Sequence, residues 1–393
     1  MPHPPSAPTG RIVLFGATGY TGDLCARTLV AAGVRPVLAG RAPDRLRSVA
    51  GRLGGAQGPL DVQVADVTDP ASVRALVEPG DVLLTTVGPF TRWGRPAVEA
   101  AVSAGAHYVD STGEGSFVRE VVQEHGPRAA DAGSVLLTAF GYDYVPGNLA
   151  GALALRAAHA VGIPASVDVG YFLTGPSGAA GMSGGTRASA VTIMSEPGYT
   201  FRDGRLVSQR PGSELLRVRA GGRVRPAFTM PASEQFFLPR LQPSVRSVRM
   251  GLGWFGALTP AVVVSSRAGG AVDRLPLLRS GLARVLGPVA RRLAPGSSGG
   301  PDEQTRARVG SLVAADVRSA DGDLLSHVEL VGPNAYTLTA YLLAWGARAL
   351  AGLVPDVASP SAAGALGPVE VFGLDTLQAA CAEAGLVEAE EPA

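Results

Sequence analysis

Residues 11–41 read RIVLFGATGYTGDLCARTLVAAGVRPVLAGR, and this is the most informative stretch of the chain. An apolar strand at 12–15 runs directly into a glycine-rich segment at 16–22, and a helical segment and a second apolar strand at 37–39 follow. This order places free N–H groups and a helix N-terminus where a dinucleotide pyrophosphate binds. The stretch therefore predicts a dinucleotide-binding βαβ unit. A glycine-rich turn in some other α/β unit is the alternative.

The three glycines of this segment have separate tasks. Gly16 permits the tight turn, Gly19 lets the backbone approach the pyrophosphate, and Gly22 lets the helix lie close to the strand. Their spacing is G-x-x-G-x-x-G rather than G-x-G-x-x-G, so the surrounding strand–helix–strand order carries the interpretation. The residues expected to contact the cofactor here are Gly16, Ala17, Thr18, Gly19, Tyr20, Thr21 and Gly22.

The residue that ends the second strand distinguishes NAD from NADP. An acidic residue there binds the ribose 2′-hydroxyl, whereas an arginine accommodates a 2′-phosphate. This chain has Arg41 at that position, with Arg45 and Arg47 nearby and Asp44 as the only acid. A guanidinium matches phosphate geometry with paired N–H donors. The sequence predicts NADP(H); an Arg41 that is merely solvated is the alternative.

Composition and charge exclude several classes of protein. The 393 residues are enough for two domains, and the net charge of +1 gives no reason to expect a nucleic-acid partner. All 34 basic residues are arginine. The absence of lysine excludes a Walker lysine, Schiff-base chemistry on an internal lysine, and the Tyr-x-x-x-Lys pair of short-chain dehydrogenases. The five histidines and two cysteines show no metal-ligand spacing, so no metal site is expected.

The ends and apolar runs of the chain suggest a cytoplasmic protein. The first ten residues lack the basic and apolar regions of a signal peptide, and we expect a disordered tail at 1–10. Residues 250–266 form the longest uncharged apolar run, but glycines and Pro260 interrupt it and it is shorter than a spanning helix. A strand followed by a loop is expected there. Cys25 and Cys381 show no paired spacing, which fits a reducing compartment.

The first 140 residues alternate between apolar strands and helical patterns. This alternation predicts a doubly wound parallel sheet, in which ligands bind at the carboxyl ends of the strands. The expected strands are 12–15, 37–40, 62–65, 81–85, 107–109 and 135–138. The expected helices are 20–32, 43–53, 70–78, 95–104 and 117–132.

After residue 145 the pattern changes to strand-like pieces separated by glycine and proline turns. It predicts a second α+β domain with a largely antiparallel or mixed sheet, entered through a helix at 146–160. The expected strands are 167–172, 200–204, 215–220, 236–238, 245–252 and 261–265. Residues 306–319 and 324–330 are expected to pair across an Asp-Gly turn. Helices are expected again at 336–353 and 374–385.

Several segments that follow strands of the parallel sheet are candidates for the cofactor site. Asp66 follows the third strand, where it contacts the adenine edge in one interpretation and stands in a turn or caps the next helix in the other. Gly88 would let the backbone approach the cofactor, and Pro89 and Phe90 would shape the nicotinamide pocket. The further cofactor candidates are Asp66, Thr86, Val87, Gly88, Pro89, Phe90, Thr112 and Gly113.

Other residues are candidates for substrate binding. Glu114 faces the nicotinamide or substrate in one interpretation and caps the next helix in the other. Free N–H groups before the helical run at 187–194 could hold a carboxylate, thioester oxygen or phosphate, or could form a simple loop. The residues concerned are Ser183, Gly184, Gly185, Thr186 and Arg187.

Three residues after the sixth strand are the candidate proton donors. Reduction of a C=C bond by hydride leaves an enolate, which needs a proton and a donor at its oxygen. Tyr142 or Tyr144 could supply either, and Asp143 could supply the proton if its pKa were raised. In the alternative interpretation, Asp143 caps a helix and the two tyrosines pack between domains.

Seven separated segments together resemble the saccharopine dehydrogenase-like NADP-binding oxidoreductases, in particular the bacterial trans-acting enoyl reductases. They are GATGYTG (16–22), LAGR (38–41), TTVGPF (85–90), YVDSTGE (108–114), GYDYVPGNL (141–149), SGGT (183–186) and PNAYTLTAYLL (333–343). One segment departs from the pattern: relatives read G-F-D-S-x-P-S-D where this chain reads GYDYVPGN. Tyr144 thus replaces a small serine in the expected cleft wall, so the substrate of the family does not carry over directly.

The resemblance implies a Rossmann domain interrupted by a second domain. The expected divisions are a tail at 1–10, an NADP-binding Rossmann domain at 11–145, a substrate-binding and dimerisation domain at 146–330, and C-terminal helices at 331–393 that return to the Rossmann domain. The substrate is expected between the two domains. The chain is also expected to form a homodimer.

The sequence thus predicts an NADPH-dependent reductase of specialised metabolism. Its acceptor would be a conjugated C=C bond in a small-molecule or carrier-bound substrate. Neither a nucleic-acid partner nor an integral membrane segment is expected. Two alternatives remain: a C=N oxidoreductase of the saccharopine or opine type, and a non-catalytic NADP-binding partner protein.

Overall fold

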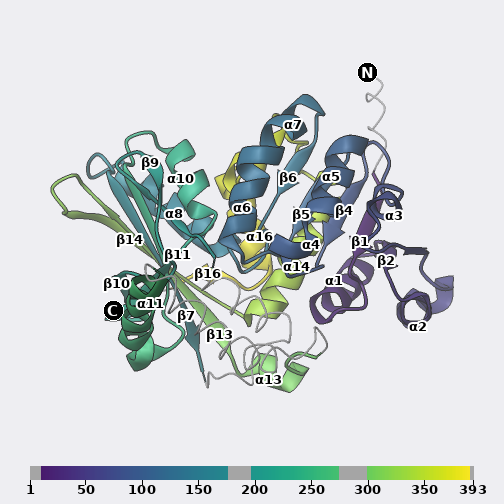
Figure 1. The fold of residues 1–393 in the computed structure, drawn as a ribbon, viewed down its shortest axis with the longest axis horizontal. Helices are drawn as coiled ribbons and strands as arrows, with labels where there is room; N and C mark the ends of the chain where they lie inside the picture. Colours follow the sequence, from purple (N-terminus) through teal and green to yellow (C-terminus); the bar gives the residue numbers. More distant parts are fainter. Residues whose placement is uncertain (1–9, 176–195, 274–298, 390–393) are drawn as a thin grey trace. The chain divides into compact units, whose positions relative to one another are not determined.

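The computed structural model describes residues 10–175, 196–273 and 299–389, which divide into two compact units (Figure 1). The first unit holds residues 10–112, Phe117–Val145 and Tyr336–Ala384. The second holds Gly113–Ser116, the described part of Pro146–Ala335, and the chain from Gly385 onward. Most of the predicted N-terminal tail, residues 1–9, lies outside the described residues.

The first unit is a doubly wound parallel sheet, as the sequence predicts. Among the described residues, the order of its seven strands is β15-β6-β5-β4-β1-β2-β3. This is the order of a dinucleotide-binding sheet with one strand, β15, added at the edge. The strands are β1 (Ile12–Phe15), β2 (Val37–Gly40), β3 (Val62–Val64), β4 (Val82–Thr85), β5 (His107–Asp110), β6 (Val135–Leu137) and β15 (Gly364–Ala365).

Burial on both faces explains why these segments form the sheet. The sequences of β1 and β4, IVLF and VLLT, are buried at every position, because helices cover both faces of a parallel sheet. The connecting elements are α1 (Tyr20–Ala31), α2 (Pro43–Gly54), η1 (Gly55–Gln57), α3 (Pro70–Arg74), α4 (Phe90–Trp93), α5 (Arg95–Ala104), α6 (Gly115–Glu120), η2 (Val121–His125) and α7 (Gly126–Asp131).

One predicted helix, at 117–132, is divided in the structure. A π-helical turn, η2, separates α6 from α7. Pro127, in the first turn of α7, has no N–H to donate, so regular α-helical bonding does not run through this point.

The C-terminal segment completes the first unit. It contributes α14 (Ala335–Leu350), β15, α15 (Pro368–Phe372) and α16 (Leu374–Glu383), and β15 pairs with β6. Trp345 of α14 stacks on Phe140 with ring centroids 6.5 Å apart, and its centroid lies 4.7 Å from that of Phe372. The aromatic cluster fixes α14 to the loop that follows β6. Beyond Ala384 the chain joins the second unit, where β16 (Val387–Glu388) pairs with β14.

The second unit is built on a mixed sheet, also as predicted. Nine strands are described, in the order β10-β11-β12-β7-β13-β14-β16, with the β8–β9 hairpin attached to β12. The further strands are β7 (Ser166–Thr174), β8 (Tyr199–Arg202), β9 (Arg205–Ser208), β10 (Leu215–Ala220), β11 (Arg223–Met230), β12 (Ser247–Leu252), β13 (Gly310–Arg318) and β14 (Leu324–Gly332). The accompanying helices are α8 (Val145–Ala158), α10 (Glu234–Leu241), η4 (Gly256–Leu258), α11 (Thr259–Asp273) and α13 (Glu303–Ala307).

Two predicted strands of this unit are wrong. Residues 236–238 lie in α10, and residues 261–265 lie in α11. A short apolar run does not distinguish a buried helix from a strand by periodicity. Phe236, Phe237 and Leu238 are all buried on their helix. In α11, Pro260 stands in the first turn, where proline favours a helix start.

The predicted hairpin across the Asp-Gly turn is confirmed. β13 and β14 pair antiparallel, with Ser311 opposite Gly332 and Asp316 opposite His327. Gly322 in the turn has a φ of 92°, a conformation that glycine adopts without steric cost. The first residues of the predicted strand, 306–309, precede β13, and Arg306 lies in α13.

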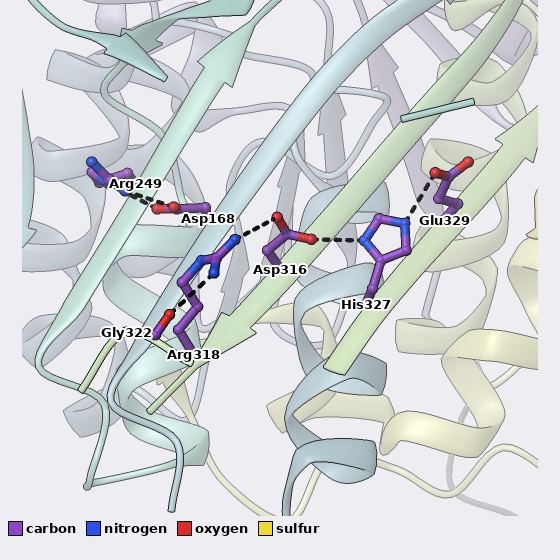
Figure 2. Close-up of polar contacts among 7 residues, drawn as sticks. All are labelled: Asp168, Arg249, Asp316, Arg318, Gly322, His327 and Glu329. Atoms are coloured by element: carbon purple, nitrogen blue, oxygen red, sulfur yellow. Dashed lines mark hydrogen bonds and ion pairs between the residues drawn. The ribbon is translucent and has the colours of Figure 1, made fainter. Parts of the chain in front are cut away.

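A row of charged side chains crosses the middle of the second sheet (Figure 2). Arg249, Asp168, Asp316 and His327 are neighbours in register on β12, β7, β13 and β14. Arg249 donates to both oxygens of Asp168, at 2.7 and 2.6 Å. His327 lies between two carboxylates, with Nδ1 2.7 Å from Asp316 and Nε2 3.0 Å from Glu329. These contacts raise the pKa of His327, and the contact with Asp316 is the largest cause.

None of the described helices is both long enough and apolar enough to cross a membrane. The run at 250–266, where a strand and a loop were expected, instead holds the end of β12, η4 and the first half of α11.

The second unit should lose stability as the pH rises through the pKa of His327. Because the folded pKa lies above the unfolded one, the charged form stabilises the fold below the unfolded pKa, and this contribution disappears above the folded pKa. We expect the melting-temperature advantage of the wild type over His327→Gln to shrink as the pH rises above about 6.5, the ordinary pKa of histidine. His159→Gln, at an exposed histidine of the same unit, is the control. A difference that stays constant or grows with pH would contradict this assignment.

Candidate active site

The candidate site lies at the carboxyl edge of the first unit's sheet. Parallel strands bring their carboxyl ends to one edge, so the segments that follow β1, β2, β3, β4, β5 and β6 gather there. The predicted residues at this edge are Gly16, Ala17, Thr18, Gly19, Tyr20, Thr21, Gly22, Arg41, Asp66, Thr86, Val87, Gly88, Pro89, Phe90, Thr112, Tyr142, Asp143 and Tyr144.

The glycine-rich turn is shaped by close backbone approaches. Gly16 has a φ of +95°, and a Cβ added there would lie 2.7 Å from Oγ1 of Thr86. A Cβ on Gly22 would lie 2.2 Å from the carbonyl oxygen of Gly16, so only glycine lets α1 begin so close to β1. Gly19 is the N-cap of α1 and offers no side chain to the first-turn N–H groups. The turn therefore presents a helix N-terminus suited to a phosphate.

The arginines after β2 have different surroundings. Arg47 is paired with Asp44 at 2.6 Å, and Arg45 donates to the carbonyl oxygen of Thr18 at 3.2 Å. Arg41 is exposed, and its positive charge contributes to the lowered pKa of Asp66.

Asp66 is engaged locally. One of its carboxylate oxygens accepts hydrogen bonds from the N–H of Thr68 at 2.9 Å and from its hydroxyl at 2.8 Å. These bonds lower the pKa of Asp66. The N-cap of α3 is instead Asp69, which accepts from the N–H of Ala71. Asp66 therefore does not cap α3, but its bonds to Thr68 place it in a turn, which is the other half of the alternative interpretation.

The segment after β4 borders the glycine-rich turn. The hydroxyl of Thr86 lies 3.4 Å from the carbonyl oxygen of Gly16, and Val87 and Gly88 are half-buried. Pro89 follows a cis peptide bond and precedes α4. The ring of Phe90 is buried, with its centroid 5.6 Å from that of Phe117. Phe90 therefore packs against Phe117 in the core of the first unit.

Asp110 connects the loops after β5 and β6. Its fully buried carboxylate accepts hydrogen bonds from the N–H groups of Thr112 and Ala139 and from the hydroxyl of Thr138, each at 2.8 Å. Burial raises its pKa to about 6 although these bonds act in the opposite direction. Ala139 has a φ of 57°, which is unusual for a residue with a Cβ, and its bond to Asp110 helps to hold it there.

The turn at Tyr142–Tyr144 follows directly. Tyr142 and Tyr144 are 2% and 3% exposed, whereas Asp143 between them is partly exposed. The carboxyl group of Asp143 is nevertheless deeply set, and this burial raises its pKa to about 7. Of the three candidates, Asp143 is the one whose carboxyl group is substantially protonated near neutral pH.

The remaining predicted residues lie elsewhere. Gly113 and Glu114 belong to the second unit, where Glu114 is fully buried and Gly115 lies against Pro231. Ser183, Gly184, Gly185, Thr186 and Arg187 lie outside the described residues. The described residues contain no group of three or more His, Cys, Asp or Glu side chains that could hold a metal ion.

The side-chain contacts of two residues of the site were not predicted. Thr339, on α14, accepts a hydrogen bond from the N–H of Tyr142, and Asp110 holds the loops described above. Asp110 ends its strand with a carboxylate, which is a usable sequence signal. Thr339 lies about 200 residues beyond Tyr142, and nothing in its helical surroundings indicates a contact with that turn.

Comparisons with known proteins agree with this geometry. The family model for the saccharopine dehydrogenase NADP binding domain matches residues 12–137. A Mycobacterium tuberculosis protein with the assigned name trans-acting enoyl reductase is 31% identical over 327 residues, which cover 76% of this chain and 78% of the relative. A trans-acting enoyl reductase of Mycobacterium ulcerans is 41% identical over 140 residues, 35% of this chain and 34% of the relative.

A solved structure shares the whole architecture. The apo saccharopine dehydrogenase (L-Glu forming) of Saccharomyces cerevisiae superposes with a TM-score of 0.59 over 97% of this chain and 99% of the other. The two sequences are 14% identical, so this similarity concerns the fold.

Substitution of Gly22 should disrupt the glycine-rich turn. In Gly22→Ala the new methyl group meets backbone atoms that side-chain movement cannot relieve, so we expect a loss of about 1–3 kcal/mol in the free energy of unfolding and weaker NADPH binding. Gly51→Ala is the matched control, because no atom lies within 4 Å of its added Cβ on helix α2. Urea unfolding and NADPH titration measure both effects. Equal behaviour of the two variants would refute the close-approach argument.

Proposed function

Because this chain belongs to the saccharopine dehydrogenase-like NADP-binding oxidoreductases, in the family of the trans-acting enoyl reductases, we propose that it reduces the conjugated C=C bond of an enoyl thioester. The observation that carries the proposal is the placement of Asp143. A carboxyl group with a pKa of about 7 stands at the same sheet edge as the glycine-rich turn. Reduction of a C=C bond needs a proton donor there, in addition to a hydride donor.

The chain is an NADP-dependent oxidoreductase, and its residues fit that cofactor. The glycine-rich turn leaves room that a Cβ would fill, beside the open N-terminus of α1. We assign the pyrophosphate to Gly16–Gly22, the 2′-phosphate to Arg41, and the nicotinamide to the segment Thr86–Pro89 with Thr112. Asp66 stands beside Arg41 and would border the adenosine part. When bound, NADPH supplies the hydride.

In the proposed reaction, hydride addition at the β carbon sends the C=C electron pair toward the thioester carbonyl. Asp143 then donates its proton to the α carbon, which gives the saturated thioester and leaves an aspartate that regains a proton from water. Tyr142 and Tyr144 are nearly fully buried, so we assign them to the walls of the site rather than to proton donation.

Further assignments follow from the resemblance and from the described residues. We assign Glu114, Gly113 and the segment Ser183–Arg187 to the acyl substrate, small or carrier-bound, as the resemblance implies.

Exposed Val331 and Val387 lie opposite each other on β14 and β16, and this apolar pair supports the proposal of a homodimer. Cys25 and Cys381 are buried free thiols, which supports a reducing cytoplasmic setting.

The test is NADPH consumption with an enoyl thioester and a cyclic imine supplied in parallel. The proposal predicts turnover of the enoyl thioester with formation of the saturated product. Turnover of the imine alone would replace the proposal with C=N chemistry. NADPH binding without turnover of either acceptor would contradict the assignment of an enoyl reductase.

Arg41 should determine the preference for NADPH. Loss of a charge-assisted hydrogen bond costs about 1.5–3 kcal/mol, so Arg41→Ala should weaken NADPH binding about tenfold to a hundredfold and leave NADH binding nearly unchanged. Arg47→Ala, at the neighbouring exposed arginine paired with Asp44, is the control. Fluorescence titration gives the dissociation constants of NADPH and NADH for the wild type and both variants. Equal losses for both cofactors would show that Arg41 does not read the 2′-phosphate.

Asp143→Asn should lower kcat about a hundredfold to ten-thousandfold, because an amide cannot donate an acidic proton, while NADPH affinity stays unchanged. In the wild type, kcat should fall as the pH rises through about 7, since the donor acts only in its protonated form. Asp131→Asn, at an exposed aspartate of α7, is the control. A wild-type rate that rises through this pH range would count against Asp143 as the donor.

A further inference from the structure

Helix α14 contacts both loops that the proposed reaction depends on. Its first turns place Tyr336 and Thr339 three residues apart, which puts them on the same face of the helix. Tyr336 contacts the glycine-rich turn, and Thr339 contacts the turn that carries Asp143. All of these residues belong to the first unit. One helix from the end of the chain thus touches two segments that are more than a hundred residues apart in sequence.

The contact with the glycine-rich turn is aromatic. The rings of Tyr20 and Tyr336 meet edge to face, with centroids 5.2 Å apart and planes at 87°. Tyr20 is the first residue of α1 and follows the N-cap Gly19 directly. Edge-to-face pairs are favourable and directional, so the ring of Tyr336 restrains the start of α1 where a pyrophosphate would bind.

The contact with the Asp143 turn is a hydrogen bond and a close packing contact. The N–H of Tyr142 donates to Oγ1 of Thr339 at 3.0 Å. A Cβ added to Gly141 would lie 2.8 Å from the methyl carbon of Thr339, so glycine at 141 lets the turn approach the helix. Thr339 therefore fixes the two residues that precede Asp143.

The same loop is held from its other side by Asp110. The Asp110 carboxylate accepts hydrogen bonds from Thr138 and Ala139, and Phe140 stacks on Trp345 farther along α14. The backbone from Thr138 to Tyr142 is thus restrained at consecutive positions, and Thr339 makes the restraint nearest to Asp143.

We propose that Thr339 and Tyr336 are positioning residues. Through them, α14 holds the turn that carries the proton donor Asp143 and the start of the cofactor-binding helix α1 in fixed positions relative to each other. This inference rests on the proposed function and deepens it. Thr339 acts on proton transfer through the Tyr142 backbone, and Tyr336 acts on cofactor binding through Tyr20. The two effects are therefore separable by experiment.

The first arm of the test compares Thr339→Val, Thr339→Ser and Thr337→Val in the full-length enzyme. Valine removes the acceptor for the Tyr142 N–H at nearly constant volume, whereas serine keeps it. We expect Thr339→Val to lower kcat about tenfold at unchanged KM for NADPH. The fall of kcat with pH should also move to lower pH, because a loosened turn lets water reach Asp143. Thr339→Ser should restore both, and Thr337→Val, at an exposed position on the same helix, should match the wild type.

The second arm compares Tyr336→Leu with Tyr336→Phe. Leucine removes the edge-to-face contact, and phenylalanine keeps the ring. Tyr336→Leu should raise the dissociation constant of NADPH about threefold to tenfold, in line with the typical strength of an aromatic pair. The pH dependence of kcat should not move. Tyr336→Phe should bind NADPH like the wild type.

The proposal is overturned if Thr339→Val lowers the melting temperature but leaves kcat and its pH dependence unchanged, since Thr339 would then be merely structural. It is also overturned if Tyr336→Leu leaves NADPH affinity unchanged. A wild-type enzyme that binds NADPH but reduces no enoyl thioester refutes the proposed function instead, and the Tyr336 arm is still decided by binding alone.

Discussion

The hydrogen bonds to the buried carboxylate of Asp110 hold together two loops of the candidate site. Asp110 ends β5 and accepts hydrogen bonds from the loops after β5 and β6. A buried carboxylate is costly unless its oxygens are occupied, and here three donors occupy them. These hydrogen bonds join the loop after β6 to the loop after β5. In the loop after β6, Ala139 has a left-handed conformation, and Asp143 follows at the carboxyl edge of the sheet.

A second constraint lies in the turn after β1, where two glycines without side chains permit close backbone approaches. Gly22 brings α1 against the Gly16 carbonyl, and Gly16 brings the turn against Thr86. The approach leaves the helix N-terminus uncapped by any side chain. Under the proposed function, the glycine-rich turn binds the phosphates of the hydride donor, and the carboxyl group of Asp143, kept partly protonated by burial, is the proton donor.

Much of this arrangement could be predicted from the sequence, because its causes are local. Buried parallel strands read as apolar runs, and the glycine-rich turn and Arg41 stand directly beside the strands that they follow. The short apolar segments at 236–238 and 261–265 were wrongly predicted as strands, since burial on a helix gives the same composition. The contact between Thr339 and Tyr142 could not be predicted, because it joins segments far apart in the chain. The raised pKa of Asp143 likewise depends on what the fold packs around it.

The proposed reaction can be tested by following deuterium from NADPH into the product. NADPH deuterated at both C4 positions is incubated with the enzyme and an enoyl thioester, and the product is examined by NMR and mass spectrometry. We expect one deuterium at the β carbon and one solvent-derived proton at the α carbon of a saturated thioester. Deuterium at the carbonyl carbon, or product without deuterium, would contradict the proposed reaction.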